Sequence, residues 1–241
     1  MQFHLLAQGF ALIAALLEVT QGHPLRSQSP DQMHSRSTLV LTAEHILTVA
    51  PTSSTCDGAP YPEQCRTAAQ AVGPIIESLN SYGTTSVGET AALIATMAFE
   101  SGDFKYNVNI SPGRPGRKWS FEIKPSSSDL TLTASIEGTR NMQMPEFNEK
   151  YAASIQALAT QLVAAKDEPD RVRALLTAND VYDFGSAAWY LKTQCGPDVR
   201  QNLASGGLDG FKAYVTGCLQ TTVTAERLAY YERANMALRG V

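Results

Sequence analysis

Apolar residues recur at helical spacing through most of the chain after residue 62. The first long example ends at Gly83, and its apolar positions are Ala68, Ala69, Val72, Ile75, Ile76 and Leu79. Steps of three and four residues place such positions on one face of an α-helix. A glycine directly after the pattern is typical of a helix end. We therefore predict a helix that begins after residue 62 and stops before Gly83.

Capping residues mark the ends of further helices. Ser86 precedes an apolar run and Glu89 follows three residues later, which is the spacing of a capping box. Pro145 suits the first turn of another helix, and Gly240 suits a C-terminal cap. The pattern predicts helices over 42–49, 91–100, 145–165, 169–177, 184–194, 197–204, 207–217 and 223–239. We find no internal repeat and no strong strand alternation, so we expect a mainly α domain with little or no β-sheet.

The N-terminal region has the features of a secretory signal. Phe10 begins an apolar run of about eight residues, which is too short to span a bilayer. Small residues at Thr20 and Gly22 fit cleavage after Gly22, although a short buried helix is the alternative. We predict a signal peptide over 1–22, a flexible polar leader over 23–41 and the folded domain over 42–241, in a secreted, extracellular protein.

Composition limits the classes of partner that the domain is expected to bind. Apolar residues make up 44% of the chain and charged residues 17%, which is enough apolar surface for a globular core. The net charge of −4 gives no basic footprint for nucleic acid. No later run is apolar enough for a membrane span. We expect no nucleic-acid or membrane partner and a monomer.

The four cysteines fit a disulfide framework in an exported protein. We favour the sequence-local pairs Cys56–Cys65 and Cys195–Cys218, because the first pair encloses a short loop with one glycine and two prolines. A structural zinc site is the rival interpretation, but it lacks C-x-x-C spacing and a nearby histidine. We expect no metal and no other cofactor.

Residues 117–136 interrupt the helical spacing of apolar residues. They have no helical period, and they contain Pro125 and three serines. One interpretation is a β-hairpin or surface insertion, which loops tolerate well. The other is a retained in-frame intron, because Arg117-Lys118-Trp119 can be encoded by CGT AAG TGG, which contains the splice-donor string GTAAGT.

The intron hypothesis predicts particular codons in the genomic DNA. We expect GTAAGT at Arg117 to Trp119, a branch-point-like CTGAC within Leu130 to Thr133, and an acceptor AG within ATA GAG at Ile136-Glu137. Excision would leave a single Gln codon between Gly116 and Gly138. Sequencing this region of the gene checks the hypothesis, and other codons at these three places would contradict it.

The positions of the histidines exclude several kinds of catalysis. All four, His4, His23, His34 and His45, precede residue 46. Ser-His-Asp and Cys-His nucleophilic catalysis both need an imidazole base, and H-E-x-x-H zinc sites need imidazole ligands. Chemistry in the domain must therefore use carboxyl, amide and hydroxyl groups.

One stretch of the sequence resembles a known family. Glu100-Ser101 ends a predicted helix, and Gly138 and Met142-Gln143-Met144-Pro145 follow before the next helix. With 117–136 left out, this order is similar to the lysozyme-like superfamily, especially its soluble lytic transglycosylase and goose-type lysozyme branch. Arg140-Asn141 stand where that family usually has Gly-Leu.

The resemblance implies a lysozyme-like helical domain with a catalytic cleft and Glu100 as the general acid. The helix dipole and the apolar neighbours Met97, Phe99 and Phe104 would favour the protonated carboxyl group. The implied activity is that of a glycoside hydrolase or lytic transglycosylase on a β-1,4-linked amino-sugar polymer, either peptidoglycan or chitin-type. The alternatives are a solvated Glu100 and an inert module that binds glycan or a host surface.

Further residues follow from this hypothesis. Inverting hydrolysis needs a second carboxylate about 6.5–9.5 Å from the acid, and Asp103 and Asp183 are the candidates. If neither converges on Glu100, a transglycosylase reaction is preferable. The candidate substrate-binding residues are Gln143, Tyr106, Asn107 and Asn109, with ordinary turn and backbone contacts as the alternative for each.

Overall fold

The computed structural model describes residues 40–109, 137–205 and 207–240. In these ranges the chain forms ten α-helices, two short 3-10 helices and a π-helical turn, and it forms no strand. The predicted mainly α fold is confirmed. The predicted signal peptide, nearly all of the predicted leader and the 117–136 insertion lie outside the described residues.

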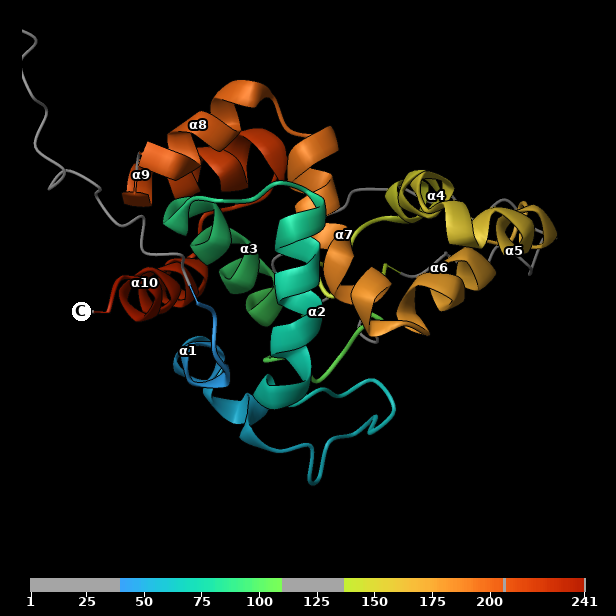
Figure 1. The fold of residues 1–241 in the computed structure, drawn as a ribbon, viewed down its shortest axis with the longest axis horizontal. Coiled ribbons are helices and arrows are strands. Elements are labelled where there is room, and N and C mark those ends of the chain that lie inside the picture. Colours follow the sequence, from blue (N-terminus) through green and yellow to red (C-terminus); the bar gives the residue numbers. More distant parts are fainter. Residues whose placement is uncertain (1–39, 110–136, 206, 241) are drawn as a thin grey trace, which may run out of the picture. The chain divides into compact units, whose positions relative to one another are not determined.

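Helix α3 (Val87–Glu100) is the central element of the domain. Eleven consecutive residues, from Gly88 to Ala98, are buried. A helix that is apolar on every side needs neighbours on every side. It packs against α1 (Ala43–Val49), α7 (Asp180–Thr193), α8 (Pro197–Ser205) and α10 (Ala225–Arg239) (Figure 1).

Ser86 caps α3 as predicted, but the helix begins four residues before the predicted start at residue 91. The Ser86 hydroxyl accepts a hydrogen bond from the Glu89 amide over 3.1 Å and donates one to the Glu89 carboxylate over 3.0 Å. The helix therefore begins directly after Ser86, at Val87. Glu89 also forms an ion pair with Arg200 of α8, with 2.6 Å between Nε and Oε1.

A second apolar cluster lies between α4 (Pro145–Ser154), α6 (Pro169–Thr177) and α7. Tyr151, Leu176 and Trp189 are among its buried members. The helix predicted over 145–165 is not continuous. Ile155 adopts an extended backbone conformation, and η3 (Gln156–Leu158) and α5 (Ala159–Ala164) follow in a new direction. This break packs α5 against α6 (Figure 1).

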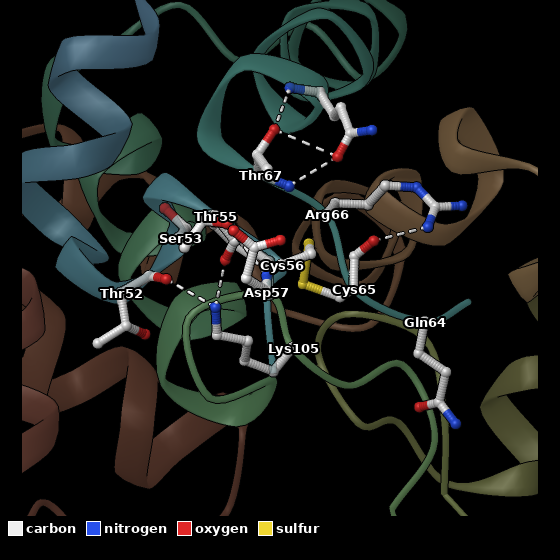
Figure 2. The surroundings of a disulfide bond; sticks show 12 residues. Thr52, Ser53, Thr55, Cys56, Asp57, Gln64, Cys65, Arg66, Thr67 and Lys105 are labelled. Carbon is white, nitrogen blue, oxygen red and sulfur yellow. Dashed lines mark hydrogen bonds between the residues drawn. A yellow bond between two sulfur atoms is a disulfide. The ribbon is translucent and has the colours of Figure 1, made fainter. Parts of the chain in front are cut away.

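Disulfides join the two sequence-local cysteine pairs that we favoured. Cys195–Cys218 connects the chain after α7 to a π-helical turn, η4 (Tyr214–Cys218), which continues α9 (Gly207–Ala213). Cys56–Cys65 closes the loop between η2 (Pro51–Ser54) and α2 (Ala68–Ser81). Figure 2 shows Lys105 reaching this region, where its ammonium group donates to the carbonyls of Thr52 and Thr55 over 2.6 and 2.7 Å.

None of the described helices combines the length and the apolar character that crossing a membrane requires.

Two glycines in helices provide a matched test of the packing around α3. A Cβ added at Gly88 would overlap the backbone carbonyl of Leu203 in α8, whereas a Cβ at Gly73 of α2 would enter open space. We expect Gly88→Ala to lower the free energy of unfolding by about 1–3 kcal/mol, because the backbones must move apart. Gly73→Ala should raise it by roughly 0.5–1 kcal/mol, because alanine favours the helix. Urea denaturation of both variants checks this, and a neutral Gly88→Ala would contradict the close approach of α3 and α8.

Candidate functional site

Glu100, the predicted general acid, is the last residue of α3 and is held by α10. Its Oε1 lies 2.7 Å from Nη2 of Arg227, and the two side chains are only 9% and 7% exposed. The Arg227 guanidinium also lies over the Phe99 ring, 4.2 Å from its centroid. The Glu100 carboxyl group therefore lies next to Phe99, one of its expected apolar neighbours. Its cationic partner was missed, and Arg227 compensates the negative charge that a buried carboxylate would otherwise leave in an apolar setting.

A pattern in the sequence could have revealed this partner. The buried residues of α10 are Arg227, Tyr231, Ala234 and Leu238. Their steps of four, three and four residues define one face of a helix. A lone arginine on an otherwise apolar face requires a buried anion, and Glu100 at the end of an apolar helix is such an anion.

Asp103, one of the two predicted second carboxylates, contacts η2 and α10. Its Oδ2 accepts hydrogen bonds from the amide and the hydroxyl of Thr52 over 3.0 and 2.8 Å. Its Oδ1 accepts one from the Tyr230 hydroxyl over 2.7 Å. Asp103 therefore ties η2 to α10, and all of these contacts are structural.

The backbone turn after α3 sets the direction of Asp103. Gly102, Asp103 and Phe104 have φ angles of 58°, 56° and 63°, in the left-handed region. Ser101 stabilises this turn, because its hydroxyl donates to the carbonyl of Met97 over 2.6 Å and accepts from the Phe104 amide over 2.9 Å. The Ser of the Glu-Ser pair thus shapes the turn that follows the helix.

Asp183, the other candidate, lies inside α7 and is completely buried. Asn179, not Asp183, caps that helix. Asp183 Oδ2 lies 2.8 Å from Nε of Arg140, and neither side chain is exposed. The Asn107 amide donates to the same carboxylate over 3.0 Å. The structure thus brings two predicted site residues, Asn107 and Asp183, together around an arginine that sequence reasoning did not select.

Arg140 joins three parts of the chain through backbone carbonyls. Its guanidinium donates to Phe104 and Tyr106 in the turn after α3 over 2.9 and 3.2 Å, and to Gln64 beside the first disulfide over 2.6 Å. It also lies 4.8 Å from the centroid of the Phe184 ring. Burial raises the pKa of the Asp183 carboxyl to about 6, while the charge of Arg140 and the hydrogen bond from Asn107 act in the opposite direction.

The remaining predicted substrate-binding residues contact other parts of the chain. Gln143 is buried, and its amide donates to the Asn148 side chain over 2.8 Å. Asn109 donates from its backbone and side-chain nitrogens to Glu137 over 3.0 and 2.8 Å. Tyr106 is partly exposed and packs edge-on against Tyr61. None of these contacts involves Glu100.

Two cavities lie near the second apolar cluster. The larger, of about 480 Å³, lies between α5, α6 and the start of α7, and the smaller, of about 210 Å³, lies between α2, α4 and α7. Tyr182 lines both. Glu100, Asp103 and Asp183 line neither cavity.

Potential metal ligands do not gather into a cluster in the part of the chain that the structure describes. No group of three or more His, Cys, Asp or Glu residues there could hold a metal ion. His45 is engaged in the cap of α1, where its Nδ1 accepts a hydrogen bond from the Thr42 amide over 3.3 Å. Both cysteine pairs are disulfide-bonded.

Comparison with known proteins connects the chain to an oxygenase. No family model matches the sequence, and no solved structure matches it. The chain is 37% identical over 188 residues to a bifunctional dioxygenase–epoxy alcohol synthase from Fusarium oxysporum (strain Fo5176). The match covers 76% of this chain but only 13% of that relative.

This similarity overturns the functional hypothesis drawn from the sequence. A glycan-cleaving activity, a polysaccharide partner and the glycosidase, hydrolase and cell-wall assignments are wrong, because the relative is a dioxygenase and synthase. The inert glycan-binding alternative falls with them. The contacts of Glu100 give a physical reason for this correction, since its carboxylate binds Arg227 of α10. The lysozyme-like resemblance and secretion stay predictions.

The buried Asp183 predicts a pH dependence of stability. Its pKa in the folded chain, about 6, lies above the value of about 3.9 expected in an unfolded chain. Below pH 4 the group is protonated in both states. Between pH 4 and 6 the folded state binds more protons than the unfolded state, so stability falls as the pH rises.

We expect the melting temperature of the wild type to fall by several degrees between pH 4 and 6.5, relative to the double variant Arg140→Met/Asp183→Leu. The double variant removes both charges, so neither is left buried alone. Calorimetry across this range measures the difference. Asp170→Asn, which removes an exposed carboxylate paired with Arg173, is the control and should keep the wild-type slope. Parallel curves for the wild type and the double variant would contradict the assignment.

Proposed function

We propose that the chain is an accessory, non-catalytic domain of an oxygenase system. The observation that carries the proposal is the 37% identity to a segment that makes up 13% of a bifunctional dioxygenase–epoxy alcohol synthase. A segment of that size accounts for a small part of a protein with two activities. The match covers 76% of this chain, so the accessory role applies to most of the domain.

The roles of the carboxylates support a non-catalytic domain. Glu100 forms an ion pair with Arg227, Asp103 binds Thr52 and Tyr230, and Asp183 forms an ion pair with Arg140. Each carboxylate joins elements that are far apart in the sequence. Breaking a buried pair by removing one partner costs about 3–5 kcal/mol, so these groups are committed to holding the fold.

The chemistry of oxygen activation supports the same assignment. Haem iron is commonly held by a histidine or a cysteine thiolate, and non-haem iron by two histidines and a carboxylate. In the described residues the single histidine, His45, caps α1, and every cysteine is in a disulfide. The oxidative chemistry of the relative is therefore assigned to the rest of that protein, and this domain supplies binding or positioning.

The secretory signal predicted over 1–22 belongs to the same proposal. Two disulfides brace the described domain, and disulfides persist in oxidising compartments. A rigid, disulfide-braced domain suits a binding role outside the cell.

The Fusarium relative offers a direct test of the accessory role. We expect deletion of its 188-residue matched segment to leave kcat for both activities within about twofold, because the catalytic groups remain, and to raise KM. Replacing the segment with this chain should restore KM. Oxygen uptake and product analysis on the relative's own substrate measure both activities.

The proposal has two outcomes that would refute it. One is oxygen uptake by this chain alone on that substrate. The other is loss of both activities from a deletion variant that circular dichroism shows to be folded.

A further inference from the structure

The smaller cavity, between α2, α4 and α7, has the size of a site for a small polar molecule. Ser78, Tyr151 and Gly185 line it and are buried, so they form its inner wall. Glu77 and Ser81 are exposed and lie at its opening. The volume of about 210 Å³ is below the roughly 300–1,000 Å³ of sites for drug-sized ligands. The cavity therefore suits a ligand of only a few heavy atoms.

The lining of this cavity carries a negative charge. Among the described residues that line it, Glu77 is the only charged one. Within the same part of the chain, Glu77 forms no ion pair. Burial raises the pKa of the Tyr82 and Tyr151 hydroxyl groups above their ordinary value, so both stay neutral at pH 7. The lining thus attracts a cation and repels an anion.

Three tyrosines surround this charge. Tyr151 packs against Trp189, with 5.1 Å between the ring centroids. The rings of Tyr82 and Tyr182 contact no other aromatic ring, Lys or Arg side chain in the part of the chain that the structure describes. The face of an aromatic ring attracts cations, and proteins use several such rings together to bind quaternary ammonium ligands. The tyrosines and Glu77 therefore favour an organic ammonium ion.

A buried hydroxyl group adds a polar contact to the inner wall. Ser78 is only 3% exposed, and its hydroxyl group makes no hydrogen bond with another described residue. Buried polar groups are almost always hydrogen-bonded. Because Ser78 lines the cavity, a hydroxyl group on a bound molecule can be its partner. This contact favours an ammonium ion that also carries a hydroxyl group.

We propose that this cavity binds one small quaternary ammonium ion with a hydroxyl group, of which choline is the simplest example. The trimethylammonium group lies against Tyr82 and Tyr182 beside Glu77, and the hydroxyl group bonds to Ser78. Free choline is the expected ligand, and a phosphocholine headgroup is not, because Glu77 at the opening repels a phosphate. The inference rests on the lining of the cavity and does not depend on the Fusarium relative.

Three probes separate the charge of the ligand from its shape. Isothermal titration of the full chain with choline at pH 7.5 should give one site with a submillimolar Kd. The neutral analogue 3,3-dimethylbutan-1-ol has a carbon in place of the ammonium nitrogen, so it should bind at least tenfold more weakly. Phosphocholine should bind at least threefold more weakly than choline, because its phosphate lies near Glu77.

A pair of charge variants locates the cation site. Glu77→Gln removes the negative charge and should weaken binding of choline at least fivefold, while binding of the neutral analogue stays within twofold. Glu232→Gln removes an exposed carboxylate of α10 outside the cavity. This matched control should bind choline as the wild type does.

Two further variants test the ring and the hydroxyl group. Tyr82→Leu should weaken binding of choline at least fivefold, whereas Tyr82→Phe keeps the ring and should stay within twofold. Ser78→Ala should weaken binding of choline at least threefold and leave tetramethylammonium, which has no hydroxyl group, unchanged. Thermal melting of each variant shows that it is folded.

Each contrary outcome overturns a stated part of the inference. If no probe binds, if choline and its neutral analogue bind equally, or if Glu77→Gln and Glu232→Gln have equal effects, the cavity is not an ammonium site. If Tyr82→Phe weakens binding as much as Tyr82→Leu, the ring does not bind the cation. If phosphocholine binds as tightly as choline, the headgroup replaces free choline as the ligand. All of these measurements use this chain alone, so they are distinguishable from failure of the deletion experiment on the Fusarium relative.

Discussion

The buried ion pair between Arg140 and Asp183 is the interaction on which the arrangement of the domain most depends. Both side chains are fully enclosed, so their charges must be satisfied inside the protein. Arg140 achieves this with Asp183 and with backbone carbonyls at Phe104, Tyr106 and Gln64. One guanidinium therefore connects α7, the turn after α3 and the chain beside the first disulfide. Since a buried charge cannot exchange these partners for water, the relative positions of the three segments are set by its geometry.

The ion pair between Glu100 of α3 and Arg227 of α10 also satisfies its charges inside the protein, before the turn that follows α3. Glu100 and Arg227 close the end of the central helix, while Asp103 ties the next residues to Thr52 and Tyr230. The turn thus carries three consecutive left-handed residues, and the middle one, Asp103, is itself anchored through its carboxylate. Such backbone is costly and persists only where its surroundings determine it. Here those surroundings are the contacts to η2 and α10, which explains why the acidic groups at this turn serve the fold.

The helices were largely predictable from the sequence, because apolar spacing and caps are local signals. Ser86, Pro145 and Gly240 mark helix ends where the structure has them. The break at Ile155 was missed, because only packing of α5 against α6 favours an extended residue there. The surroundings of the candidate site residues were less predictable, since each buried carboxylate pairs with a residue far away in the sequence. Asp183 is 43 residues from Arg140 in the sequence, and Glu100 is 127 residues from Arg227. The apolar face of α10 marks Arg227 as a buried cation, but no local pattern selects Arg140 as the partner of Asp183.

The contacts of the charged and polar residues also explain why the lysozyme-like motif did not identify the function of the domain. Ser101 stabilises a turn, Gln143 binds Asn148, and Glu100 binds Arg227, so these three motif residues have structural roles. Residues that match a catalytic motif can serve the fold alone, because fold and function are separable. The domain's buried charges form internal pairs, whereas the α5–α6 cavity is lined mostly by apolar residues, with Gln161, Arg171 and Asn179 as its polar ones.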